Sequence, residues 1–396
     1  MLSQHYKDMC NSASVIRALS VYATERGKEI GYENVFDYTL GNPSVPVPDA
    51  FNEAVIDILR TKTSAEAHGY SPNPGNPEVR SIVADSLKRR FGLDYEQKHI
   101  FMTSAAAASA IAHAVRCVAA PGDEVLTFAP HFPEYYPYIN ETGAILKTVP
   151  AQTKDFQINF EEFEKMMNPK VQAVLINTPN NPTGAAYSAD TLKKLAAVLL
   201  EKEKEYGHEI FIISDEPYRE IVFDNAETPY VSAFYDNTLS CYSFSKSLSI
   251  PGERIGYLAV NPKAKDADMI VPMCVQISRG TGHNCPSSVI QQAVGRCIDM
   301  TSDLKVYEKN MNILYDEFKA LGFEVVRPSG TFYIFPKALE EDANAFCEKA
   351  KKYDLIMVPS DSFGVKGYVR LAYCIETEKV ERSIPVLRRF VEENYR

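Results

Sequence analysis

Tryptophan is absent from the chain, and its eight cysteines form no C-x-x-C pair and no cluster with the seven histidines. Metal sites and redox dithiols need such spacings, so the sequence predicts a reduced, metal-free protein with a cytoplasmic location. No run of 18 apolar residues occurs, and residues 1–11 are polar and charged. These absences argue against a membrane span and against a signal peptide.

Blocks of lysine and arginine are also missing, and the formal net charge is -10. Nucleic acids and anionic membranes bind basic patches, so we expect neither of them as a partner. The chain has 396 residues, of which 45% are hydrophobic and 24% are charged. Such a chain is long enough for one large domain with an appendage, or for two domains.

Strand-like and helical stretches alternate between about residues 98 and 260. Several strand-like runs are apolar without alternation, which is typical of strands covered by helices on both faces. The pattern predicts a mostly parallel α/β sheet, in which ligands gather at the C-terminal ends of the strands. The runs cover residues 99–102, 124–128, 144–149, 172–176, 209–213, 239–243 and 255–260.

The last third of the chain has a different character. Helical stretches at 287–300 and 303–321 precede short strands at 323–326 and 331–335, and a further strand is expected at 368–373. This mixture predicts a smaller α+β domain. We expect a large domain over residues 49–280, and a small domain that combines residues 1–48 with 281–396.

The most informative local motif surrounds Lys246. It reads Ser243-Phe244-Ser245-Lys246-Ser247, and Arg254 follows eight residues after the lysine. An amine can form a Schiff base with an aldehyde cofactor, while hydroxyls and a guanidinium can hold the phosphate of that cofactor. The alternative is a solvated lysine in a serine-rich turn.

Two further polar residues follow buried strands. Asp215 follows the apolar run at 211–213 after Ser214, at a strand end where a carboxylate can pair with a pyridinium nitrogen, although a helix cap or turn is an alternative. Asn181 lies in the loop 177–184, which consists almost wholly of turn-forming residues. A rigid loop would fix Asn181 for a hydrogen bond to a ring oxygen.

Together these segments resemble the class I/II aminotransferases of the aspartate aminotransferase superfamily, which have pyridoxal-phosphate fold type I. The resemblance covers essentially the whole chain. It rests on Asn-Pro-x-Gly at 181–184, Asp215-x-x-Tyr218, Ser243-x-Ser245-Lys246 and Arg254-x-Gly256. It implies a mostly parallel seven-stranded sheet in the large domain, pyridoxal 5'-phosphate as cofactor, and ping-pong transfer of an amino group from an L-amino acid to a 2-oxo acid.

The resemblance also implies roles for individual residues. Lys246 would carry the cofactor and shuttle a proton, Asp215 would hold the ring nitrogen, and Asn181 and Tyr218 would bond the ring hydroxyl oxygen. Phe132 would stack on the ring. The implied phosphate ligands are Ser243, Ser245, Arg254, the backbone N–H groups of Ala105 and Ala106 at a helix start, and Tyr70 of the neighbouring subunit.

The resemblance implies four substrate-binding positions: Asn181, already named for the cofactor, together with Arg370, Gly41 and Arg279. Arg370 lies inside the apolar strand 368–373, where a buried guanidinium needs a partner. The resemblance implies that this partner is the α-carboxylate of the substrate. A structural ion pair is the alternative. Gly41 would close over the same carboxylate. Arg279 stands five residues before Asn284, the spacing at which some members bind a distal carboxylate, so aspartate or glutamate is weakly favoured. Arg279 is equally compatible with an exposed surface site.

Tyr70 and Asn284 resemble residues that line the partner's site, which implies a homodimer with shared active sites. The sequence also departs from the family: the phosphate loop reads Ser104-Ala105-Ala106-Ala107, without the usual glycine, which predicts weaker cofactor binding. Phe132 occupies a place that many members give to tryptophan.

Two other functions use similar residues. A C–S β-lyase of the same fold would use the same lysine, aspartate and arginine. A regulatory module with an aminotransferase-like domain would also need a DNA-binding region, and the chain has neither a spare N-terminal domain nor a basic recognition helix.

Overall fold

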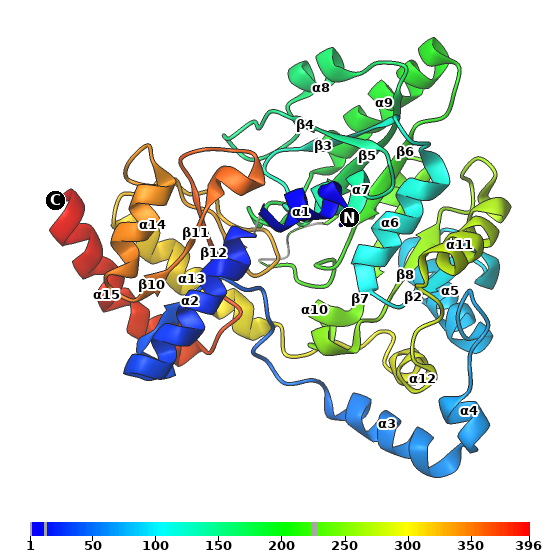
Figure 1. Cartoon of the computed structure of the whole chain (residues 1–396), viewed down its shortest axis with the longest axis horizontal. Coiled ribbons are helices and arrows are strands. Elements are labelled where there is room, and N and C mark those ends of the chain that lie inside the picture. The colour runs from blue at the N-terminus through cyan, green and yellow to red at the C-terminus, as the bar shows by residue number, and fades with distance from the viewer. Residues whose placement is uncertain (1, 12–13, 224–225, 227) are drawn as a thin grey trace.

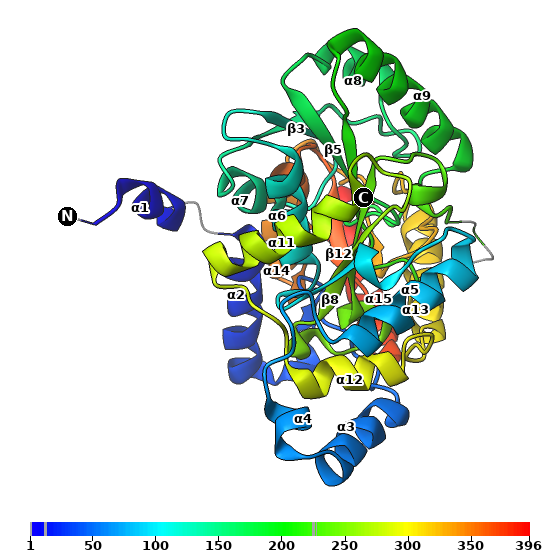
Figure 2. The same cartoon turned by 90° about the vertical axis from the view of Figure 1, so that its right-hand side faces the viewer.

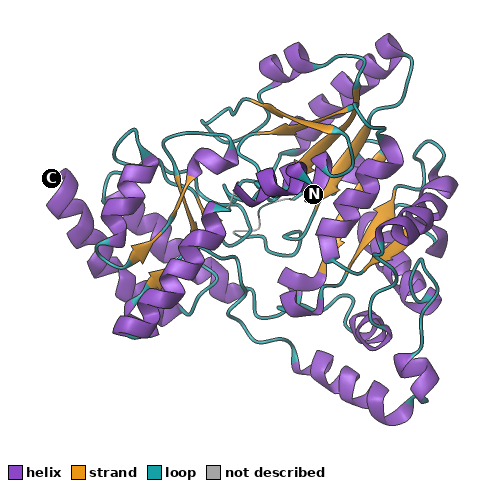
Figure 3. Ribbon diagram, in the orientation of Figure 1, coloured by secondary structure: helices purple, strands orange, loops and turns teal. Residues whose placement is uncertain are grey.

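The computed structural model describes residues 2–11, 14–223, 226 and 228–396. In that part of the chain, one large sheet and two small ones are each surrounded by helices (Figures 1 and 3). The large sheet and its helices form the larger body, and the two small sheets belong to a smaller body beside it.

The described part of the large sheet has seven strands: β2 (Ile100–Thr103), β3 (Glu124–Phe128), β4 (Ile145–Val149), β5 (Val171–Asn177), β6 (Phe211–Asp215), β7 (Thr238–Ser243) and β8 (Gly256–Val260). Their order is β2-β8-β7-β6-β5-β3-β4. β8 runs antiparallel to both of its neighbours, and the other adjacent pairs are parallel. The predicted mostly parallel α/β sheet is confirmed.

Helices cover both faces of this sheet, which explains the non-alternating apolar strands. Val125 and Ile213 pack under helices on one face, while the adjacent Leu126 and Ile212 pack on the other. The first face is covered by α6 (Ala106–Val118) and α11 (Ala267–Thr281). The second face is covered by α5 (Pro77–Phe91), α8 (Phe160–Met166) and α9 (Ala189–Tyr206).

The smaller body combines the two ends of the chain. β1 (Phe36–Asp37) pairs in parallel with β10 (Leu355–Ile356). A second sheet contains β11 (Val358–Pro359), β12 (Val369–Ala372) and β9 (Tyr333–Ile334), in that order and antiparallel. Its helices are α2 (Val15–Ile30), α13 (Lys305–Ala320), α14 (Ala343–Lys351) and α15 (Thr377–Tyr395).

One expected strand is wrong. Residues 323–326 have no regular structure, because Phe323 turns into the core of the smaller body. Its ring contacts Phe318 edge-on, with ring centroids 4.9 Å apart. The apolar residues at 323–326 therefore suggested a strand, whereas in the structure a buried phenylalanine follows a helix there.

Helix α12 (Ser288–Arg296) packs on the larger body rather than on the smaller one. Its Ala293 and Val294 share a core with Ile58 and Val83, and it lies beside α3 (Asp49–Thr61) and α4 (Ser64–His68) (Figure 2). We therefore propose a domain boundary after α12, and not at residue 281 as the sequence suggested.

The remaining elements are short. Helix α1 (Gln4–Asn11) extends away from both bodies (Figure 2). Among the described residues, each helix is too short or too polar to cross a membrane. The other short helices are α7 (Tyr135–Asn140), α10 (Phe244–Ser247) and the 3-10 turns Tyr32–Asn34, Gln97–His99, Val231–Ala233, Pro251–Glu253 and Ser360–Phe363.

Candidate active site

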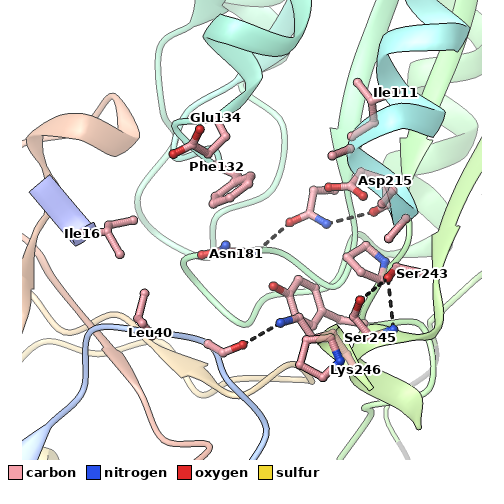
Figure 4. A pocket seen from close by; sticks show the side chains of 18 of the residues that line it. Ile16, Leu40, Ile111, Phe132, Glu134, Asn181, Asp215, Ser243, Ser245 and Lys246 are labelled. Carbon is pink, nitrogen blue, oxygen red and sulfur yellow. Dashed lines mark hydrogen bonds between the residues drawn. The ribbon is translucent and has the colours of Figure 1, made fainter. Parts of the chain in front are cut away.

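A cavity of about 310 Å³ lies where β5, β6 and β7 end, and residues of the smaller body complete its wall. Figure 4 shows Asp215, Ser243 and Lys246 on one side of it and Ile16 and Leu40 on the other. The location agrees with the general rule for ligand sites in parallel sheets. The lining residues include Ile16, Arg17, Leu40, Gly41, Ala106, Ala107, Phe132, Glu134, Tyr138, Asn177, Asn181, Asp215, Tyr218, Ser243, Ser245, Lys246, Arg254, Tyr333 and Arg370.

Lys246 lies on the one-turn helix α10, which follows β7. Ser243 caps this helix by accepting a hydrogen bond from the Ser245 N–H at 3.1 Å. The Lys246 Nζ donates to the Gly41 carbonyl oxygen at 2.6 Å. The pKa of Lys246 is lowered to about 8, mainly by burial; Cys374 opposes this shift, and Arg254 and Arg370 add smaller lowering effects. A lowered pKa makes more of the amine available as a nucleophile near neutral pH.

Asp215 ends β6 and is buried. Its Oδ2 accepts a hydrogen bond from the Tyr135 hydroxyl at 2.7 Å, whereas its Oδ1 has no partner among the described residues. Burial raises the pKa of Asp215 to about 7; the Tyr135 hydroxyl lowers it and Glu216 adds to the rise. A buried carboxylate oxygen without a partner, beside a cavity, is a site for a cation or an N–H donor.

Hydroxyls, a guanidinium and a helix start meet at one end of the cavity. The Ser243 Oγ donates to the Ser245 Oγ at 2.8 Å, and the Arg254 Nη2 donates to the Ala105 carbonyl at 3.1 Å. Helix α6 begins at Ala106, and helix starts favour anions. These groups can hold a phosphate.

The structure refines the part expected of Ala105. Its N–H donates to the Ser109 Oγ at 3.3 Å, and Ala105 does not line the cavity. Ala106 and Ala107 do line it. The first N–H groups of a helix lack intrahelical acceptors, so we propose Ala106 and Ala107, rather than Ala105, as the backbone donors.

Arg370 lies on β12 with only 2% of its surface exposed. Its Nη1 donates to the Asn181 Oδ1 at 3.2 Å and its Nη2 donates to the Thr39 carbonyl, but its Nε has no partner among the described residues. No carboxylate of the described chain pairs with it, so the structural ion pair that we considered is not found there. Burial lowers the pKa of Arg370, because the charged form is desolvated.

Asn181 is held by Asn177. The Asn181 N–H donates to the Asn177 Oδ1 at 2.7 Å, and the Asn177 Nδ2 donates to the Asp215 carbonyl at 2.9 Å. The Tyr218 and Tyr333 hydroxyls are hydrogen-bonded at 3.2 Å. The loop after β5 is therefore tied to the strand end that carries Asp215.

Phe132 and Gly41 also line the cavity, and their expected contacts with the cofactor and the substrate stay predictions. Phe132 lines the cavity and contacts Tyr135 edge-on, with ring centroids 5.8 Å apart. A Cβ on residue 41 would overlap the Tyr333 hydroxyl, so the close approach of this backbone to the cavity requires glycine.

Three expected residues lie outside the cavity of their own chain. Tyr70 is fully exposed, Asn284 is exposed, and Arg279 is exposed with its Nη1 donating to the Gln276 Oε1 at 2.8 Å. Their expected roles depend on a second subunit and stay predictions.

Several residues near the cavity could not be selected from the sequence. Tyr135 was visible in the segment Pro130-His131-Phe132-x-x-Tyr135, three residues after the aromatic that we selected, but nothing linked it to Asp215. Tyr333 resembled an ordinary strand residue. Arg17 lies far before the first predicted strand of the large sheet and belongs to no motif that links it to the site.

The comparisons with known proteins agree with this geometry. The family model "Aminotransferase class I and II" matches residues 33–387. The chain belongs to this family. Members of the family use pyridoxal 5'-phosphate, so the predicted family, enzyme class and cofactor are confirmed, and the fold is confirmed by the neighbours described next.

Curated relatives and solved structures match over nearly the whole chain. A probable aspartate/prephenate aminotransferase of Aquifex aeolicus is 30% identical over 93% of this chain and 95% of its own length. Aromatic-amino-acid aminotransferase 2 of Thermococcus litoralis is 28% identical, with 92% and 93% covered. An amino transferase structure from Eubacterium rectale has a TM-score of 0.96 and 40% identity, with 100% of both chains covered. None of these relatives is described as a C–S lyase or a regulator, so the comparisons do not favour the two alternative functions.

The residues present fit the family's cofactor. The unpartnered Asp215 Oδ1 can accept from a pyridinium N–H, and the amine of Lys246 lies in the same cavity. Ser243, Ser245 and Arg254 gather beside the start of α6, as a phosphate requires.

Proposed function

We propose that this aminotransferase moves an amino group between amino acids and 2-oxo acids through Lys246, with Asp215 and Arg370 as its two charged anchors. The observation that supports the proposal is that Lys246, Asp215 and Arg370 line the same cavity. A reactive amine, an unpartnered buried carboxylate oxygen and a buried guanidinium without a carboxylate partner in the described chain line the same space.

Pyridoxal phosphate, when bound, supplies an aldehyde carbon and a protonated ring that withdraws electrons from the substrate's Cα. Lys246 serves as the base that removes the Cα proton and as the acid that returns it at C4'. Its lowered pKa of about 8 supports this role, because a free amine is accessible near physiological pH.

Asp215 holds the proton on the ring nitrogen. Tyr135 fixes the carboxylate by donating to Oδ2, which leaves Oδ1 for the ring. A cation placed there would favour the charged form of Asp215, which burial alone disfavours.

Arg370 orients the substrate. A bidentate bond to the α-carboxylate would position the Cα–H bond toward Lys246, and orientation of this kind contributes strongly to rate. Asn181 Oδ1 and the Thr39 carbonyl keep the guanidinium in place until a carboxylate arrives.

We also propose a homodimer with shared sites and a cytoplasmic location. The exposed Tyr70 and Arg279 support the first, because neither serves the cavity of its own chain. The cysteines are free thiols, and the Cys117 and Cys274 sulfurs lie 3.6 Å apart without a disulfide, which fits a reducing compartment.

Substitution of Lys246 by alanine tests the proposal. We expect the turnover of any amino donor with 2-oxoglutarate to fall by about 10³-fold or more, because both proton transfers lose their carrier. Treatment of the wild-type enzyme with borohydride should fix a lysine–pyridoxal adduct on the peptide that contains Lys246. A Lys305→Ala control, on an exposed helix start, should keep both the adduct and the activity. Unchanged turnover in Lys246→Ala, or an adduct at another lysine, would contradict the assignment.

A further inference from the structure

The guanidinium of Arg370 lies over two aromatic rings of the smaller body. Its Cζ is 4.7 Å from the centroid of the Tyr333 ring and 5.1 Å from that of the Phe363 ring. We infer that Tyr333 and Phe363 are positioning residues of the α-carboxylate site, because their rings hold the guanidinium by cation–π contacts and leave its N–H groups for the substrate. The inference rests on the proposed function and adds two residues to the same site.

Arg370 needs partners that do not compete with a substrate. It is 2% exposed, and its hydrogen bonds go to two neutral acceptors, the Asn181 Oδ1 and the Thr39 carbonyl oxygen. Burial of a cation among neutral groups is costly. An acidic side chain would offset this cost, but it would also occupy the N–H groups that a carboxylate requires. An aromatic ring attracts the cation through its face and leaves the N–H groups at the guanidinium edge free.

Tyr333 is held beside Arg370 from two sides. It lies on β9, where it is paired in register with Ala372 of β12. Its hydroxyl is hydrogen-bonded to the Tyr218 hydroxyl at 3.2 Å, and the two rings meet edge-on with centroids 5.7 Å apart. The ring that contacts Arg370 therefore also contacts the tyrosine expected to bond the cofactor.

Phe363 is fixed by contacts with both bodies. It ends the 3-10 turn Ser360–Phe363, which precedes β12, and its side chain is fully buried. Its carbonyl oxygen accepts a hydrogen bond from the His131 N–H of the larger body at 3.0 Å. His131 directly precedes Phe132, the aromatic expected to stack on the cofactor. The turn that carries the Phe363 ring thus lies against the segment that carries Phe132.

Ordinary core packing is the competing explanation for these rings. Phe335 offers the comparison, because it is buried in the same apolar cluster as Phe363, with ring centroids 6.1 Å apart. Phe335 stacks on Tyr368 at 5.2 Å, and among the described residues the cation–π contacts of Arg370 are with Tyr333 and Phe363 instead. Loss of the Phe335 ring should therefore weaken packing without changing the guanidinium site.

The test compares two ligands that differ only in the α-carboxylate. 2-Aminoisobutyrate carries this group and has no Cα proton to lose, and isopropylamine has a hydrogen in its place. Calorimetry on the full-length enzyme loaded with cofactor should show tighter binding of 2-aminoisobutyrate to the wild type. Phe363→Leu should reduce this preference about 5- to 30-fold, as expected for loss of a desolvated cation–π contact, by weakening the amino acid and leaving the amine unchanged. Phe335→Leu is the matched control and should keep the wild-type preference.

Tyr333 provides a second, independent pair of variants. Tyr333→Phe keeps the ring and should keep the preference, whereas Tyr333→Leu removes the ring and should reduce the preference as Phe363→Leu does. Loss of the hydroxyl bond to Tyr218 affects both ligands equally, so it does not change the ratio of their dissociation constants. Thermal unfolding of every variant would confirm that each is folded at the temperature of the measurement.

Retention of the preference by both leucine variants would overturn the inference. Equal weakening of the two ligands, or a loss in Phe335→Leu as large as that in Phe363→Leu, would also overturn it, because the rings would then serve packing alone. A missing adduct at Lys246 would overturn the proposed function but leave a preference for the carboxylate intact. A wild type without any preference would overturn both.

Discussion

In the cofactor-free protein, the ionised carboxylate of Asp215 has no positively charged partner among the described residues. One carboxylate oxygen is bound by Tyr135, the other has no partner in the described chain, and the neighbouring Glu216 is also buried and acidic. Such a group destabilises the fold when it is ionised, and its unpartnered oxygen fits the contact with the cofactor that we propose for it. Ligand chemistry and fold stability are thus opposed at this one residue.

Substitution of Asp215 by asparagine should therefore stabilise the cofactor-free protein. The folded-state pKa of about 7 lies above the usual 3.8, so the folded protein binds the extra proton between these values and its stability falls as pH rises through that window. Above pH 7 the full penalty applies, and we expect Asp215→Asn to raise the free energy of unfolding by up to about 4 kcal/mol at pH 8.

Urea unfolding of both cofactor-free proteins at pH 5 and pH 8 would measure this effect. The gain should shrink at pH 5, where Asp215 is already protonated in the folded state. An equal gain at both pH values would point to packing rather than to charge. The same substitution should weaken catalysis, because the ring nitrogen loses its anionic partner.

The first strand–helix unit illustrates how elements position the phosphate site. Gly256 begins β8 between β7 and the start of α6, and a Cβ there would overlap the Tyr242 carbonyl oxygen and lie 3.1 Å from the Ala106 Cα. The sequence motif Arg254-x-Gly256 thus has a packing reason, since this glycine lets the start of α6 approach the strand beside Arg254.

Substitution of Gly256 by alanine should displace the start of α6 and weaken cofactor binding. We expect the dissociation constant for pyridoxal 5'-phosphate to rise about 10-fold or more, with destabilisation of about 1 to 3 kcal/mol from overpacking. Fluorescence titration and thermal unfolding would measure both quantities. Gly252→Ala, in the 3-10 turn before β8, is the matched control, because a Cβ there meets nothing within 4 Å. Equal affinities for the two variants would disprove the packing argument.

Helices and strands could be predicted from the sequence where a local pattern of residue types determines them. All seven strands of the large sheet overlap the runs predicted from the sequence. Six of them are buried along nearly their whole length and are largely apolar for that reason, whereas the edge strand β4 alternates between buried and exposed residues. Residues 323–326 and α12 were not predictable in this way. An apolar stripe shows that a segment is buried, and it does not show against which body, so the packing of α12 against α3 could not be predicted from the sequence.

At the scale of the whole molecule, the site belongs to two bodies. Lys246 and Asp215 come from the large sheet, whereas Arg370, Gly41 and Tyr333 come from the smaller body. The bond between Lys246 and the Gly41 carbonyl joins residues 205 positions apart in the sequence. Correct packing of the two bodies is therefore required before any substrate can be held.

A hybrid of two defective subunits tests whether sites are also shared between chains. We expect a particle of twice the 44.3 kDa chain mass. If Tyr70 serves the partner's cofactor, Lys246→Ala and Tyr70→Ala homodimers will both be impaired. A mixed dimer will contain one intact site, built from Lys246 of one subunit and Tyr70 of the other.

Activity recovered after co-refolding of the two variants would measure this complementation. We expect about half of the wild-type activity per mixed dimer, since one of two sites is complete. Purification through two different affinity tags would isolate the mixed species. A mixed dimer no more active than the mean of its parents would show that Tyr70 acts only within its own chain or not at all.

The sequence by itself determined the family and the sheet and predicted the proposed reactive centre, because the motifs around the lysine, the aspartate and the proposed phosphate site are short segments whose chemistry is local. The tertiary structure decided which residues stand beside them. Tyr135 meets Asp215 across 80 positions of sequence, and Arg17 reaches the cavity from the start of the smaller body. Such neighbours arise from the packing of distant segments, which no local pattern of residue types records.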